Sequence, residues 1–130
     1  MAGTFKFELV TPERMALSED AAQVVVPGVE GQFTVLPGHA PVLSALRPGV
    51  VEVTLPDASK TRIFVKGGFA EVDAESVTVL AERALAVEAM DAATIAAEIE
   101  TAEAELAAAG DDAARLAAAA ALEGLRALGR

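Results

Sequence analysis

The stretch VPGVEGQFTVLPGHAP, residues 26–41, decides the fold that the sequence predicts. It places three prolines and three glycines around a short apolar run. Proline fixes φ and glycine permits positive φ, so this composition specifies tight turns rather than catalytic groups. The pair Pro37-Gly38 suits a type II turn, which favours proline at its second position and glycine at its third. The stretch therefore predicts a corner between short strands of an all-β domain.

Segments on both sides of this stretch predict further strands as far as residue 86. Residues 5–9 alternate between apolar and charged side chains, the period-2 signature of a half-buried strand. The runs at 50–55 and 61–65 are rich in β-branched residues, and their spacing predicts a hairpin. Gly67-Gly68 lacks the spacing, the lysine and the following helix of a phosphate loop, so we expect a bulge or a close backbone approach there.

The sequence changes near Val87 to a helical pattern. Asp91 suits the N-cap of a helix at 92–108, and Gly110 suits the position after its C-terminus. Asp111 or Asp112 would cap a second helix. The short connection between the two helices requires them to run antiparallel. We therefore predict an all-β sandwich at residues 1–86 followed by an antiparallel α-helical hairpin at residues 87–130.

Apolar residues at helical spacing give each helix one stripe, and four glutamates lie largely off the first stripe. The stripes are Ile95, Ile99, Ala102 and Leu106, then Leu116, Leu122, Leu125 and Leu128; the glutamates are Glu98, Glu100, Glu103 and Glu105. Because much of the hairpin is alanine, it buries little area, and we expect it to need the sandwich or another subunit for stability.

Composition excludes several functions. The chain has 130 residues, no cysteine and one histidine, so neither disulfides nor a multi-histidine metal site within one chain can form. Its net charge of −10 argues against binding to nucleic acid or to anionic lipid. No stretch approaches the roughly 20 apolar residues that span a bilayer, and the N-terminus lacks a signal-peptide core. We expect a cytoplasmic or peripheral protein with no direct lipid insertion, no cofactor and no metal.

The ordered set of motifs resembles the epsilon subunit of bacterial F-type ATP synthases. The motifs are Leu36 to Pro41, Leu46-Arg47-Pro48-Gly49, the Gly67-Gly68 strand, the strand at 77–82 and the alanine-rich tail. The resemblance implies a non-catalytic, central-stalk rotor subunit that contacts the gamma subunit and the c ring. It further implies a peripheral place on the cytoplasmic face of the bacterial inner membrane, and a contact of the tail with the catalytic beta subunit.

The resemblance also suggests which residues bind partners. His39 either bonds a backbone group within its loop or contacts gamma, with Gly38 shaping the same turn. The turn at Glu30, Gly31 and Gln32 is either a plain polar tip or the end that meets the c ring. Some relatives carry an acidic residue where Gln32 stands, and Glu30 could substitute for it.

Other candidate sites have simpler interpretations. Asp91 is interpreted as a helix cap and only weakly as a nucleotide ligand, because Thr94 stands where ATP-binding relatives have an arginine. The carboxylates at 71, 73 and 75 are interpreted as a solvated face rather than an acid–base pair. Two functions of other classes stay open at this point: a free-standing sandwich that binds a small ligand, and a jelly-roll enzyme, for which the chain offers almost no catalytic groups.

Overall fold

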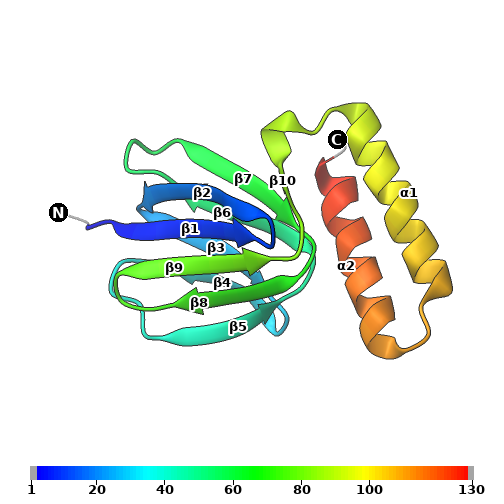
Figure 1. Cartoon of the computed structure of the whole chain (residues 1–130), viewed down its shortest axis with the longest axis horizontal. Coiled ribbons are helices and arrows are strands. Elements are labelled where there is room, and N and C mark those ends of the chain that lie inside the picture. The colour runs from blue at the N-terminus through cyan, green and yellow to red at the C-terminus, as the bar shows by residue number, and fades with distance from the viewer. Residues whose placement is uncertain (1–2, 129–130) are drawn as a thin grey trace.

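The computed structural model describes residues 3–128, which form a β-sandwich followed by two helices (Figure 1). The strands are β1 (Phe5–Thr11), β2 (Arg14–Ala21), β3 (Gln23–Gly28), β4 (Gly31–Val35), β5 (Val42–Leu46), β6 (Gly49–Thr54), β7 (Lys60–Val65), β8 (Gly68–Val72), β9 (Ser76–Ala81) and β10 (Ala84–Ala86). A 3-10 turn, η1 (Val87–Ala89), leads to α1 (Ala92–Ala108) and α2 (Asp112–Leu128). The predicted fold class is confirmed.

The strands form one continuous hydrogen-bonded path that folds over into two layers. One layer has the order β10-β7-β6-β3, with β4 beside β3, and the other has the order β5-β8-β9-β1-β2. The layers join where Gly28 of β3 pairs with Leu46 of β5. All pairs are antiparallel except β1 with β9, which are parallel. The predicted hairpin of residues 50–55 and 61–65 is present as β6 and β7.

The core between the layers follows the predicted alternation. Phe5, Phe7 and Leu9 of β1 are buried, whereas Lys6 is exposed and Glu8 is partly exposed. Facing strands contribute branched aliphatic side chains that are fully buried, among them Val24, Val53, Val77 and Val79. β-Branched residues pack well on pleated surfaces, so a core with few aromatic side chains still excludes water.

Four glycines of the described residues have positive φ, and two of them test the sequence predictions directly. Gly38 has a φ of 82°, and the N–H of His39 donates to the carbonyl of Leu36 over 3.1 Å. Positive φ at the third position and this hydrogen bond define the predicted type II turn. Gly68 has a φ of 127°, and a Cβ there would overlap the carbonyl oxygen of Leu80 on β9. The expected close backbone approach is thus confirmed.

The helices begin at the predicted caps, but the end of α1 differs from the usual glycine cap. The Asp91 carboxylate accepts a hydrogen bond from the N–H of Thr94 at 2.8 Å, and α1 spans the predicted residues 92–108. The Asp111 carboxylate accepts from the N–H of Ala114 at 2.7 Å and caps α2. Gly110 follows the C-cap residue Ala109 as expected, yet Ala109 is extended and Gly110 lies outside the positive-φ region. The helix therefore ends without the left-handed turn that usually requires glycine.

The hairpin lies on the sandwich through a second apolar cluster. This cluster joins buried Phe64 of β7 and Met90 to buried residues of the helices, which are Ala102, Ala121, Leu122 and Leu125. In Figure 1, α2 lies between α1 and the sheet, and α2 is the helix that contacts β6. Two sequence predictions for the helices are wrong. Glu98 is buried toward the sandwich rather than lying off the stripe, and Leu116 is 71% exposed.

Candidate partner-binding surface

One end of the sandwich brings together the residues that the sequence marks as partner-binding. The β3–β4 hairpin presents Glu30 at its exposed turn and Gly31 and Gln32 at the exposed start of β4. Its strands are held in register by pairing of Gly28 with Gly31 and of Pro27 with Gln32. A proline in β3 and glycines at both ends of the turn make this hairpin short and tight.

The type II turn places His39 beside this hairpin. The His39 Nδ1 lies 2.6 Å from the carbonyl oxygen of Ala40, which matches the interpretation of a loop histidine that bonds a backbone group. Its ring also lies against Phe33 of β4, with ring centroids 6.5 Å apart. The ring contact places His39 beside β4, whereas the hydrogen bond lies within its own turn.

A groove at this end of the sandwich, here called the tip groove, joins these residues to strand β5. It is lined by Val29, Glu30, Gly31, Gln32, Phe33, His39, Val42, Leu43, Ser44 and Ala45. Gly38 is not among these lining residues, so its contribution is the shape of the turn that carries His39. Leu43 is 72% exposed and Val29 is 53% exposed. Sequence reasoning missed both apolar residues, because single exposed apolar residues are common and are informative only when the fold gathers them into a patch.

A row of apolar side chains crosses the outer face of the layer that contains β5. Cross-strand pairing aligns one residue from each of five strands in the order Ala45, Phe69, Leu80, Val10 and Met15. Phe69, Leu80 and Met15 are each about half exposed, at 51%, 47% and 53%. Because Ala45 also lines the tip groove, this apolar row is continuous with it. Large exposed apolar surface of this kind is typical of a protein–protein interface.

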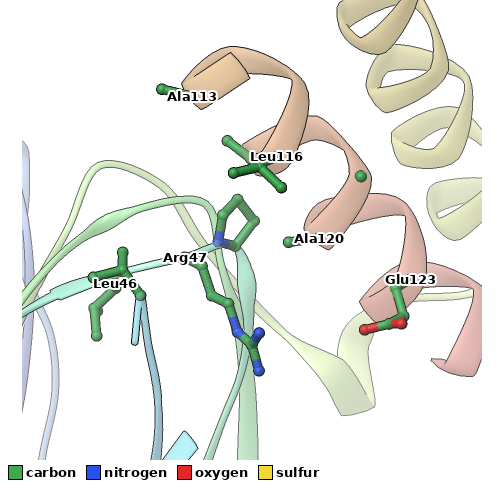
Figure 2. Close-up of a pocket in the computed structure, with 10 residues that line it drawn as sticks. Leu46, Arg47, Ala113, Leu116, Ala120 and Glu123 are labelled. Atoms are coloured by element: carbon green, nitrogen blue, oxygen red, sulfur yellow. The ribbon is translucent and has the colours of Figure 1, made fainter. Parts of the chain in front are cut away.

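A second groove opens between α2 and the turn that joins β5 to β6 (Figure 2). Leu116, Ala113 and Ala120 form its helical side, and Leu46 and Arg47 lie opposite. The exposed Leu116 projects toward this opening instead of packing in the cluster below the hairpin. Glu123 and Arg47 supply opposite charges at its edge.

Asp91 acts as a helix cap in the folded chain. Hydrogen bonds from Thr94, chiefly from its backbone N–H, hold the pKa of Asp91 below its usual value of 3.8. The two arginines that could meet a nucleotide phosphate are paired within the hairpin. Arg115 bonds Asp112 at 2.7 Å, and Arg126 bonds Glu103 at 3.1 Å.

Asp57 and Asp73 accept hydrogen bonds within their own turns, and the side chains of Glu71 and Glu75 are exposed. Asp73 accepts hydrogen bonds from the N–H groups of Glu75 and Ser76, the bond from Glu75 being the chief reason that the pKa of Asp73 is lowered. Asp57 accepts from the hydroxyl of Ser59 at 2.6 Å, which lowers its pKa in the same way. Within residues 3–128, no group of three acidic or histidine side chains is arranged to hold a metal ion. No helix in that range has both the length and the apolar character needed to cross a bilayer.

The fold and its surface define a class of protein: a β-sandwich that carries a helical hairpin and exposes a groove and an apolar row. Residues 4–87 match the family model of the ATP synthase delta/epsilon chain, beta-sandwich domain. The chain is 47% identical to the ATP synthase epsilon chain of Mesorhizobium japonicum over 115 residues, which cover 88% of this chain and 85% of that protein. It is 46% identical to the epsilon chain of Maricaulis maris, over 86% of this chain and 84% of that one. The chain therefore belongs to the family of ATP synthase epsilon chains.

Solved structures agree with this membership. A chain from the mitochondrial ATP synthase of Euglena gracilis, in a structure of OSCP, F1 and the c ring, superposes with a TM-score of 0.74 at 28% identity. That match covers 96% of this chain and 79% of the other. A chain from the central stalk and c ring of the Tetrahymena thermophila enzyme superposes with a TM-score of 0.65 over 99% of this chain and 98% of that one. At 15% identity, the second match shows the shared fold alone.

Proposed function

We propose that this chain is a rotor subunit in the central stalk of a proton-translocating F-type ATP synthase. In that role its sandwich links the gamma subunit to the c ring and couples rotation to ATP synthesis. Family membership supports the assignment to this enzyme. The observation that carries the finer proposal is the exposed apolar row, which runs without a break into the tip groove. A single rigid body thus offers two adjoining contact surfaces.

The two surfaces differ in chemistry, and we assign them to different partners. The apolar row, together with Gly38 and His39, would bind gamma through apolar burial around Phe69 and Leu80. The polar turn at Glu30, Gly31 and Gln32 would meet the c ring, with Glu30 supplying the negative charge. Charged contacts of this kind set orientation and specificity more than affinity.

The architecture suits the transmission of torque. A two-layer sandwich with a close-packed core deforms little, and its tightest turns are fixed by proline and glycine geometry. Partner contacts on one end and one face of such a body keep their relative positions under load. The hairpin is built mostly from alanine contacts and is the less suitable part for this role.

We further propose that the chain has no catalytic site, cofactor or metal of its own, and that it acts on the cytoplasmic face of the bacterial inner membrane. Any nucleotide binding at Asp91 would be weak, since Arg115 and Arg126 are paired with carboxylates. Any contact of the hairpin with the catalytic beta subunit would restrain ATP hydrolysis only weakly, because α1 presents glutamates and no basic residue.

The test is capture of gamma by the full-length chain carrying changes in the apolar row. Phe69→Ser with Leu80→Ser should weaken the retention of gamma by roughly tenfold or more, as expected for exposed hot-spot side chains. The matched control is Leu116→Ser, which changes an exposed leucine of the hairpin. Equal retention by the row variant and the control would overturn the assignment. Glu30→Lys tests the second surface and should reduce the retention of the c ring without affecting gamma.

A further inference from the structure

The hairpin carries one buried carboxylate, and it is held by two cations of the sandwich. The Glu98 side chain is 9% exposed on α1, and its Oε2 accepts a hydrogen bond from Nη2 of Arg83 at 2.9 Å. Its Oε1 lies 3.6 Å from Nζ of Lys66, whose side chain is 15% exposed. Lys66 also lies 4.0 Å from the carboxylate of Glu105, which is further along the same helix. Burying a carboxylate is costly unless cations compensate it, so this cluster depends on all of its members.

The sandwich brings the two cations together through the Gly67-Gly68 pair. Lys66 lies between β7 and β8, and Arg83 lies between β9 and β10. The N–H of Lys66 donates to the carbonyl of Arg83 at 3.0 Å, so the two backbones are adjacent. A side chain at Gly68 would clash with Leu80, so this close approach requires glycine. The Gly67-Gly68 pair therefore helps to position Lys66 and Arg83, the two cations that contact Glu98 of α1.

Other contacts between the hairpin and the sandwich specify position less strictly. The apolar cluster between the hairpin and the sandwich uses alanines of both helices with Leu122 and Leu125, and the partly buried Ile95 and Ile99 pack against it. The alanine contacts are alike at successive turns, so they distinguish poorly between neighbouring positions of a helix along the sandwich. A buried polar contact can supply this specificity, as a single buried polar residue does for the register of a coiled coil.

We propose that the ion pairs of Glu98 with Lys66 and Arg83, here called the ionic latch, hold the hairpin in its docked position on the sandwich. When the latch is broken, the population in which the hairpin is separated from the sandwich rises, while both parts stay folded. The apolar contacts between α1 and α2, together with the ion pair between Arg126 and Glu103 at 3.1 Å, would keep the two helices paired in the released state. All residues of the latch lie within this one chain, so this inference does not depend on the proposed rotor role.

The test measures the distance between the two parts of the full-length chain. Since the chain has no cysteine, Ala74→Cys on the sandwich and Ala104→Cys on α1 give a unique pair of exposed positions for spin labels. The chain with an intact latch should show one docked distance. Glu98→Gln should raise the population at longer distances by about tenfold or more, with helix content from circular dichroism unchanged.

The matched control is Glu100→Gln, which makes the same charge change at an exposed position of the same helix. It should keep the docked distance. The latch is refuted if Glu98→Gln gives the same distance distribution as Glu100→Gln. It is also refuted if the Glu98→Gln chain loses helix content together with its docked population.

If Glu98→Gln fails to fold, Arg83→Gln provides a second test. Arg83→Gln changes a side chain that is 55% exposed, so it should leave the sandwich folded while removing the shorter of the two contacts to Glu98. It should also increase the population at longer distances. A docked distance that is unchanged in a folded Arg83→Gln chain would equally overturn the proposal.

Discussion

Single residues matter in this molecule mainly through backbone geometry and charge. Gly68 combines positive φ with a close approach to Leu80, so no other residue fits there. Gly110 has neither property, because its φ is outside the positive region and no atom lies within 4 Å of the place that a Cβ would take. The sequence predicts a structural role for each glycine, yet only Gly68 is required by the fold.

We predict that Gly68→Ala lowers the free energy of unfolding by at least about 3 kcal/mol, because a strained φ and a backbone clash act together. Gly110→Ala is the matched control. It should be neutral or stabilising by up to about 1 kcal/mol, since alanine restricts the unfolded chain. Urea unfolding of both variants measures the difference. Similar midpoints would show that β8 and β9 can separate without loss of stability.

The cap at Asp91 predicts a pH dependence. Its pKa is lowered in the folded chain, so its contribution to stability is fully present above the usual value of 3.8 and is lost as the pH falls through the folded pKa. Asp91→Asn keeps a capping oxygen but cannot titrate. We expect the wild-type chain to have the higher helix melting temperature at pH 7, and the difference to shrink at pH 3. A difference that is constant with pH would contradict this assignment.

At the scale of elements, the sequence predicts periodic structure well and tertiary orientation poorly. The β1 alternation, the type II turn and the N-cap of α1 follow from local rules that need no knowledge of neighbours. Glu98 and Leu116 do not, because their environments depend on which side of each helix meets the sandwich. The exposed apolar row was missed for the same reason. Phe69 and Leu80 form a surface only when five strands align.

The exposure of Leu116 gives a prediction for α2. Leu116→Gln should change the free energy of unfolding by less than about 0.5 kcal/mol, because the side chain is already in water. Leu125→Ala should lower the free energy of unfolding by about 2–5 kcal/mol, because Leu125 of α2 is fully buried in the cluster between the hairpin and the sandwich. Thermal unfolding of the two variants makes the comparison. A large loss on Leu116→Gln would mean that the second groove is closed in solution.

For the whole molecule, we propose a division into residues 1–86 and 87–130. A chain ending at Ala86 should unfold cooperatively, with stability lower by about 1–3 kcal/mol because Phe64 loses its cover. Phe64→Thr is the matching variant, and it should be tolerated better in the short chain than in the full chain. An unfolded short chain would show that the sandwich depends on the hairpin.

The assembled enzyme tests the tail. We expect the ATPase rate with the full chain and with residues 1–86 to agree within about twofold, because the α2 arginines are already engaged by Asp112 and Glu103 and exposed ion pairs are weak. The comparison uses enzymes with equal content of the chain and intact proton pumping. A several-fold rise on truncation would show that the tail inhibits through contacts other than these.

The parallel pairing of β1 with β9 has a consequence for folding. Lys6 pairs with Ser76 and Val10 with Leu80, so the first strand finds a partner that is made near the end of the sandwich. Contacts this distant in the chain raise the loop-closure entropy that must be overcome before folding, and they slow it. During synthesis, the β1–β2 hairpin therefore lacks its neighbouring strand until β9 has left the ribosome. The growing chain depends in that interval on the charged residues of these two strands, which discourage pairing with other chains.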